Sequence, residues 1–126
     1  MFTARKSRIL VADDEQLIAD TLAMIFSRSG YEVATVYNGV QAVEKAMHWH
    51  PDLFLGDVHM PKLNGIEAAT AICARFPACR VLLFSAGASS SVLVHEARCT
   101  GHHFEFVEKP ILPIDLLSRI RRLGIT

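Results

Sequence analysis

The side chains best suited to chemistry in this sequence are carboxylates, a serine and a lysine, and each follows a short apolar run. Asp57 ends the apolar run 53–56, inside the block Pro51–Gly65. An apolar run bounded by turn residues is typical of a strand buried on both faces. The carboxyl ends of parallel strands form the ligand-binding edge of open α/β folds. The polar residues in equivalent positions after other runs are Asp13, Asp14, Ser85 and Lys109.

Brought to one edge of a sheet, these residues have the composition of a phosphoryl-transfer site. Clustered carboxylates repel one another unless a cation neutralises them, and oxygen ligands at an open edge suit Mg²⁺. With Asp57 as the nucleophile, the product would be an aspartyl phosphate. Lys109 would then balance the phosphoryl charge as a compact cation, and Ser85 would hydrogen-bond a phosphoryl oxygen.

Each of these residues also has a plain structural explanation when it is taken alone. The pair Asp13 and Asp14 would open a helix, where the helix dipole favours acidic side chains. A lone Lys109 is usually solvated, and a lone Ser85 usually caps a turn or a helix. The functional interpretation therefore depends on all of them occurring together, in this order, at successive strand ends.

The pattern of apolar residues predicts the elements that must hold these side chains. Strands are expected over 8–12, 31–37, 53–56, 80–84 and 104–107, and helices over 17–26, 40–47, 66–76 and 114–121. A Gly- and Ser-rich segment over 86–91 leads into a weaker fourth helix over 92–99. Five strands alternating with five helices predict one α/β domain with a doubly wound parallel sheet.

Composition excludes several other classes of protein. Thirteen basic and thirteen acidic residues leave no net charge on the 126-residue chain, so we expect no general attraction to nucleic acid or to a membrane surface. The three arginines near the C-terminus fit a solvated last helical turn, where the helix dipole favours cations. We find no signal peptide and no apolar run long enough to span a membrane. Three cysteines without C-x-x-C spacing favour a reducing, cytoplasmic compartment.

Four sequence blocks together resemble the receiver domain of bacterial two-component response regulators. These blocks are ILVADDE, LFLGDVHMPKLNG, FSA and FVEKP, and the resemblance extends over about Ser7 to Leu123. It implies a single receiver domain over 1–126 with its core over about 7–123. It also implies a CheY-like, flavodoxin-like fold with the strand order 2-1-3-4-5.

The resemblance also assigns a phosphoacceptor and a magnesium site to matching positions. Asp57 is implied to accept the phosphoryl group and to bind Mg²⁺. Asp14 is implied to be a direct ligand, Asp13 a ligand through water, and the backbone carbonyl of His59 the remaining protein ligand. Because the ring of His59 stands two residues after Asp57, we hypothesise that it tunes dephosphorylation. An unchanged phosphoryl half-life in His59→Ala would refute that hypothesis.

A second group of residues is implied to respond to the phosphate. Ser85 and Lys109 are expected to contact the phosphoryl group. Phe106 matches the switch aromatic, whose ring is implied to turn inward when Ser85 shifts toward the phosphate. The peptide bond between Lys109 and Pro110 is implied to be cis.

The partners implied are a histidine kinase or phosphotransfer protein as phosphoryl donor and a downstream target protein. We expect a signalling protein rather than an enzyme, acting at most on its own phosphorylation and dephosphorylation. The output surface is expected on the fourth helix, fifth strand and last helix, with a monomer or a weak dimer formed through that face. No direct binding of nucleic acid or membrane is expected.

Two alternatives remain open at this point. A pseudo-receiver would act as a protein-interaction module without phosphorylation, although the intact set of Asp14, Asp57, Ser85 and Lys109 argues against it. A phosphatase of the haloacid-dehalogenase type also uses an aspartate at a strand end, but it would need a second aspartate where this chain has His59. Nucleotide-binding glycine motifs are missing from the sequence. His48 and His50 would not share a helix face and are assigned no site.

Overall fold

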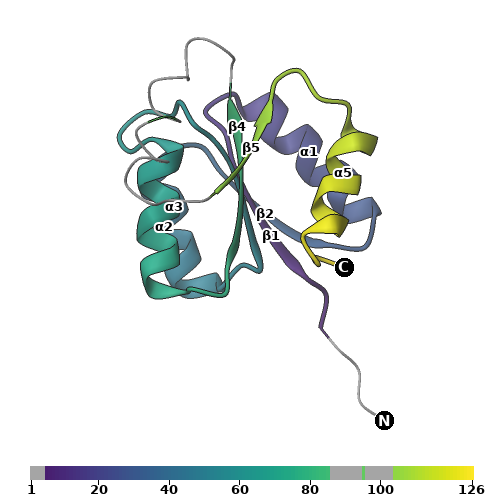
Figure 1. The fold of residues 1–126 in the computed structure, drawn as a ribbon, viewed down its shortest axis with the longest axis horizontal. Coiled ribbons are helices and arrows are strands. Elements are labelled where there is room, and N and C mark those ends of the chain that lie inside the picture. The colour runs from purple at the N-terminus through teal and green to yellow at the C-terminus, as the bar shows by residue number, and fades with distance from the viewer. Residues whose placement is uncertain (1–4, 86–94, 96–103) are drawn as a thin grey trace.

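A five-stranded parallel sheet forms the centre of the protein (Figure 1). The computed structural model describes residues 5–85, 95 and 104–126. Its strands have the order β2-β1-β3-β4-β5, and this confirms the predicted order. Their bounds are β1 (Arg8–Ala12), β2 (Glu32–Val36), β3 (Leu53–Asp57), β4 (Arg80–Ser85) and β5 (Glu105–Glu108).

Helices cover both faces of the sheet in Figure 1, with α1 and α5 on one side and α2 and α3 on the other. Their bounds are α1 (Gln16–Arg28), α2 (Gly39–Trp49), α3 (Gly65–Arg75) and α5 (Pro113–Arg122). The described residues thus contain four helices, not the predicted five. The predicted fourth helix, over 92–99, lies almost entirely outside them.

The core has two halves, because alternate side chains of each strand point to opposite faces of the sheet. Leu10, Phe54 and Leu83 pack on the α2 and α3 side. On the α1 and α5 side, Leu53 and Leu82 pack against the helical side chains. All five residues of β3 are buried, as expected for a central strand covered on both faces.

Side-chain caps fix where two helices begin beside the carboxyl edge of the sheet. Asn38 accepts a hydrogen bond from the backbone N–H of Gln41 at 2.8 Å and starts α2. Asn64 and Glu67 form a reciprocal capping box at the start of α3, with hydrogen bonds of 2.8 and 3.1 Å. The Asn64 capping box lies in the connection from β3 to α3, and the Asn38 cap lies in the connection from β2 to α2.

Within the described residues, none of the helices is both long and apolar enough to cross a membrane. Cys73 and Cys79 are free thiols, and burial raises the pKa of Cys79 to about 12. Cys99 lies outside the described residues.

Candidate functional site

The predicted chemical residues come from four strands and meet at the carboxyl edge of the sheet. Asp13 directly follows β1, Asp57 is the last residue of β3, Ser85 is the last residue of β4, and Lys109 directly follows β5. Backbone hydrogen bonds continue the strand ladder past its ends. The N–H of Asp13 donates to the carbonyl of Val36 at 3.2 Å, and that of Lys109 donates to the carbonyl of Ser85 at 2.9 Å. The sheet therefore fixes the backbone from which each side chain extends.

Three carboxylates form a compact cluster at this edge. One oxygen from each of Asp13, Asp14 and Asp57 lies within 4.8 Å of the others. The side chains differ in exposure: Asp13 is 1% and Asp57 7% exposed, whereas Asp14 is exposed. A half-open cluster of carboxylate oxygens is the type of site that binds a hard divalent cation.

Lys109 is the cation that lies against this cluster. Its Nζ is 2.5 Å from Oδ2 of Asp57 and 3.5 Å from Oδ2 of Asp13. Burial on its own would lower the pKa of Lys109, but the hydrogen bond and charge of Asp57, together with Asp13, outweigh burial and raise it. Lys109 therefore stays charged, and one lysine faces three carboxylates.

The two carboxylate oxygens of Asp13 have different surroundings. Its Oδ1 accepts a hydrogen bond from the backbone N–H of Glu15 at 2.9 Å. Its Oδ2 is buried, and no described group donates a hydrogen bond to it. Burial raises the pKa of Asp13, more than the N–H of Glu15 and the charge of Lys109 lower it. A buried carboxylate oxygen without a donor is costly unless something else binds it.

The connection after β3 holds Asp57 from both sides. The backbone N–H of Val58 donates to the carbonyl of Phe84, and that of Gly65 donates to the carbonyl of Val58, each at 2.9 Å. The N–H of His59 donates to Oδ1 of Asp57 at 2.9 Å. One carboxylate oxygen thus faces a backbone donor, and the other faces Lys109.

The start of α3 packs unusually close to this acceptor. A Cβ atom on Gly65 would lie 2.2 Å from the carbonyl oxygen of Asp57, so only glycine fits without a backbone shift. The sequence places Gly65 at the end of the block Pro51–Gly65, but it does not show this contact. The contact depends on how α3 lies on β3, which no local pattern specifies.

Comparisons with known proteins identify the family of this chain. The model of the response regulator receiver domain matches residues 9–121. The chain belongs to this family. It is 29% identical over 118 residues to the chemotaxis protein CheY of Thermotoga maritima, a match that covers 93% of this chain and 97% of that protein. It is 39% identical over 114 residues to the transcriptional regulatory protein PdtaR of Mycobacterium tuberculosis, covering 90% of this chain and 54% of PdtaR.

Solved receiver structures show the same fold. A CheY-like receiver domain protein from Methanospirillum hungatei superposes with a TM-score of 0.82 at 26% identity, over 94% of each chain. CheY4 of Vibrio cholerae also gives a TM-score of 0.82 at 26% identity, over 94% of this chain and 99% of that one. The chain therefore spans nearly the whole of these CheY proteins but about half of PdtaR.

The remaining predicted residues are His59, Ser85, Phe106 and Pro110. The side chain of His59 is exposed, and Ser85 is partly exposed at the end of β4. Phe106 pairs with Leu83 in the strand register and packs on the α2 and α3 side of the core. The bond from Lys109 to Pro110 is cis, as the resemblance implied. The chemical roles of these residues stay predictions.

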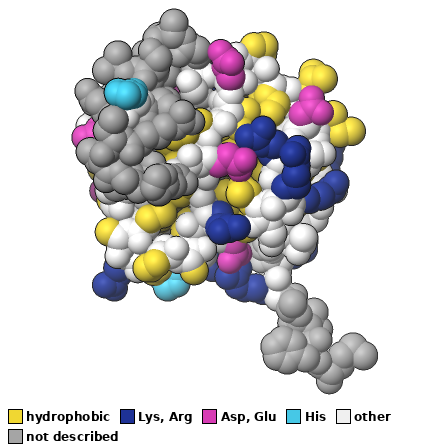
Figure 2. Space-filling model, in the orientation of Figure 1, with side chains coloured by type: hydrophobic (Ala, Val, Ile, Leu, Met, Phe, Trp, Pro, Cys, Tyr) yellow, Lys and Arg dark blue, Asp and Glu magenta, His cyan; other side chains and the backbone are white. Residues whose placement is uncertain are grey.

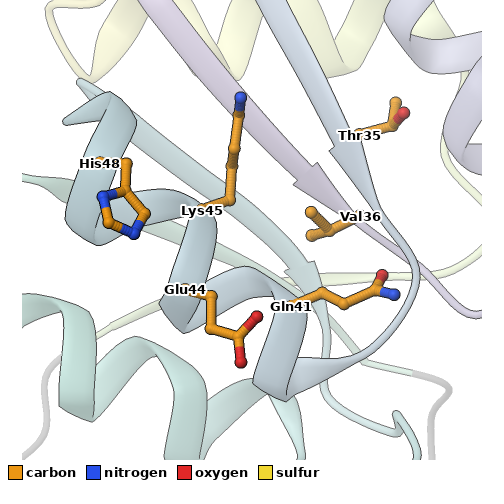
Figure 3. Close-up of a pocket in the computed structure, with 6 residues that line it drawn as sticks. All are labelled: Thr35, Val36, Gln41, Glu44, Lys45 and His48. Atoms are coloured by element: carbon orange, nitrogen blue, oxygen red, sulfur yellow. The ribbon is translucent and has the colours of Figure 1, made fainter.

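A separate hollow of about 490 Å³ lies between the edge strand β2 and α2 (Figure 3). Gln41 at this hollow accepts a hydrogen bond from the backbone N–H of Tyr37 at 2.9 Å, so its amide caps the end of β2. His48, to which the sequence assigned no site, is part of the lining. The full lining is Thr35, Val36, Gln41, Glu44, Lys45 and His48, which includes none of the predicted site residues.

Charged side chains of both signs share the face of the receiver domain in Figure 2, where Lys and Arg lie beside Asp and Glu. In the last turn of α5, Arg119 pairs with Glu105 at 3.1 Å, and Arg121 and Arg122 are exposed. This pairing and the exposure of the other two arginines agree with a solvated last turn of α5.

Proposed function

We propose that this receiver domain accepts a phosphoryl group on Asp57 from a histidine kinase or a phosphotransfer protein and signals by protein contact. The observation that carries the proposal is the ion pair of Lys109 with Asp57, beside a buried oxygen of Asp13 that has no donor among the described residues. One lysine and three carboxylates leave a negative excess that suits a divalent cation. The membership in the receiver family supports the same function.

The donor set fits Mg²⁺, which prefers oxygen ligands and keeps several of its waters. Asp14 and Asp57 would bind the ion directly, Asp13 would bind through water, and the backbone carbonyl of His59 would complete the protein ligands. Bound Mg²⁺ would neutralise the carboxylates and part of the charge of the incoming phosphoryl group. The buried Oδ2 of Asp13 then gains a favourable environment.

The chemistry proposed is an in-line displacement at phosphorus. A carboxylate oxygen of Asp57 forms the new P–O bond, while the bond from phosphorus to the donor nitrogen or oxygen breaks and the donor leaves with its electron pair. The N–H of His59 keeps the carboxylate oriented through its 2.9 Å hydrogen bond. The ammonium group of Lys109 then pairs with a phosphoryl oxygen in place of the carboxylate. The hydroxyl of Ser85 donates a hydrogen bond to another phosphoryl oxygen.

The signal would arise from these new contacts. When Ser85 moves toward the phosphate at the end of β4, it leaves room beside its neighbour β5, on which Phe106 is carried. We propose that the ring of Phe106 then turns inward and that the surface around β5 and α5 favours an arrangement recognised by the target protein. A cytoplasmic location and a monomer or weak dimer formed through that surface belong to the same proposal.

Incubation with Mg²⁺ and acetyl phosphate, followed by intact-mass measurement, tests the function directly. Wild type should gain the mass of one phosphoryl group, and Asp57→Asn should gain none. Asp52→Asn is the matched control, because Asp52 stands five residues earlier at the opposite end of β3. Uptake by Asp57→Asn at the wild-type level would overturn the proposal. No uptake by wild type would favour the pseudo-receiver instead.

A further inference from the structure

The ring of Phe84 lies under the ammonium group of Lys109. Nζ of Lys109 is 5.5 Å from the ring centroid, a distance at which a cation is attracted by the face of an aromatic ring. Phe84 is next to Asp57 in the register of β3 and β4. One residue therefore neighbours the acceptor through its backbone and the lysine through its side chain.

The surroundings of Phe84 make it a rigid platform. Only 4% of the residue is exposed, and it belongs to the core on the α1 and α5 side. Its carbonyl accepts the N–H of Val58 at 2.9 Å, and its strand partner on the other side is Val107. A side chain confined in this way has few other rotamers open to it.

Lys109, by contrast, has room to leave the site. Its side chain is 27% exposed, and a cavity of about 220 Å³ opens beside it. Apolar side chains of α1 and α5 line that cavity, among them Ile18, Leu22 and Leu116, together with Phe84. The flexible four-carbon stem of a lysine could lie along such a surface while its charged end pointed to water.

The carboxylates attract Lys109 less strongly when a divalent cation is bound than when it is absent. When a divalent cation binds Asp57 and Asp13, it competes with Lys109 for the same oxygens. The attraction of the Phe84 ring does not depend on those oxygens. The ring can therefore retain the ammonium group at the moment when the carboxylates are engaged elsewhere.

We propose that Phe84 is a positioning residue, which keeps the ammonium group of Lys109 beside Asp57 so that it meets the incoming phosphoryl group. The placement of the lysine follows from the structure alone, and its effect on phosphorylation rests on the function proposed above. Phe84 acts through Lys109 and touches neither phosphate nor metal.

Three variants separate a role in positioning from a role in packing. Phe84→Met removes the ring and keeps a flexible apolar side chain of similar size, whereas Phe84→Tyr keeps the ring. Phe26→Met is the matched control, because Phe26 is fully buried in the same half of the core, on α1, and is not among the residues around Lys109. Circular dichroism at the assay temperature establishes that each variant is folded.

The first readout is the reactivity of the lysine without any phosphoryl donor. Reductive methylation with formaldehyde and cyanoborohydride as the hydride donor, in Mg²⁺ buffer and followed by peptide mass spectrometry, compares Lys109 with the exposed Lys62. We expect Lys109 in Phe84→Met to react roughly three- to tenfold faster, the range expected for loss of one cation–π contact. Lys62 should not change, and Phe84→Tyr and Phe26→Met should match wild type. An unchanged rate at Lys109, or an equal rise in Phe26→Met, would overturn the proposal.

The second readout is phosphoryl uptake from acetyl phosphate at saturating Mg²⁺. Phe84→Met should be phosphorylated roughly three- to tenfold more slowly, with the Mg²⁺ dissociation constant unchanged because all three carboxylates remain. Phe84→Tyr should restore the rate. A parallel loss of Mg²⁺ affinity, or no rescue by tyrosine, would contradict positioning. If wild type takes up no phosphoryl group, the proposed function fails, whereas the methylation result still decides where the lysine is held.

Discussion

The two ends of the sheet both carry clustered charges, but they balance them differently. At the amino end, Arg5 donates to both oxygens of Asp52 at 3.0 and 3.2 Å, and Arg8 pairs with Glu32 at 3.4 Å. The backbone N–H of Arg8 adds a bond of 2.8 Å to Asp52. Two cations face two anions there, and most of these groups are partly exposed.

At the carboxyl end, the described residues place one lysine against three carboxylates, and two of the three are buried. Burying like charges together raises the free energy of the folded state. The β-ladder and the cap of α3 hold the cluster in place in spite of this repulsion. The paired charges at the amino end need no ligand to balance them, whereas the buried negative excess at the carboxyl end is what the proposed Mg²⁺ would neutralise.

The largest expected effect concerns the glycines near the two ends. Gly65→Ala should lower the free energy of unfolding by roughly 3 kcal/mol, because the new Cβ would overlap the backbone carbonyl of Asp57. Gly30, after α1 at the amino end, has φ +99° and nothing within 4 Å of such a Cβ. Gly30→Ala should therefore lower the free energy of unfolding by only about 1 kcal/mol, because of backbone strain. Urea unfolding measures both, and equal losses would contradict the close packing at the site.

Addition of Mg²⁺ should stabilise the protein through the carboxyl end only. When the Mg²⁺ concentration is tenfold above the dissociation constant, the free energy of unfolding of wild type should rise by about 1.4 kcal/mol, which is seen as a rise in Tm. Asp52→Asn should gain as much, since it changes the other end. Asp57→Asn should gain much less. An equal rise in Asp57→Asn would place the ion elsewhere.

Without a divalent cation, Asp13→Asn should make the protein more stable at pH 7, by roughly 1 kcal/mol. Burial raises the pKa of Asp13 above its ordinary value of 3.8, so this side chain binds a proton more tightly in the folded protein than in the unfolded chain. The stability that this protonation gives is complete below the ordinary pKa and is lost as the pH rises through the raised one. The advantage of asparagine should therefore shrink in acid. Thermal unfolding of wild type and Asp13→Asn, from pH 7 down into acid, measures this stability difference. If Asp13→Asn were less stable than wild type at pH 7, the buried carboxylate of Asp13 would not be destabilising.

The smallest effect is expected from the matched pairs. Arg5→Ala should change the free energy of unfolding by no more than about 0.5 kcal/mol, because exposed ion pairs contribute little. Salt at about 1 M should abolish even this difference. A loss several times larger, insensitive to salt, would show that the amino end also stores electrostatic energy.

Most of the sheet could be predicted because its strands are short apolar runs between turn residues. β1 has the bounds that the sequence indicated, whereas β3 includes Asp57 and β5 is shifted by one residue toward the C-terminus. Strand ends depend on hydrogen bonds to neighbouring strands, and a single run does not contain that information.

The sequence predicted which residues form the site, but it did not predict the contacts between them. Strand order brings Asp13, Asp57, Ser85 and Lys109 to one edge, so their types and positions sufficed. Three contacts join distant segments: Lys109 with the buried Oδ2 of Asp13, the ring of Phe84 with Lys109, and Gly65 with Asp57. These contacts depend on side-chain rotamers and on how the helices pack on the sheet. The periodicity of apolar residues in the sequence contains neither kind of information.

The single tryptophan has a practical consequence for spectroscopy. Arg8 donates to the carbonyl of Trp49 at 2.6 Å, and Arg8 and Lys45 each lie 5.5 Å from its ring centroid, so the indole is fixed at the amino end of the sheet. Its fluorescence should follow global denaturation faithfully. Occupancy of the acidic pocket at the opposite end should leave the emission almost unchanged, so a titration there requires an introduced fluorophore.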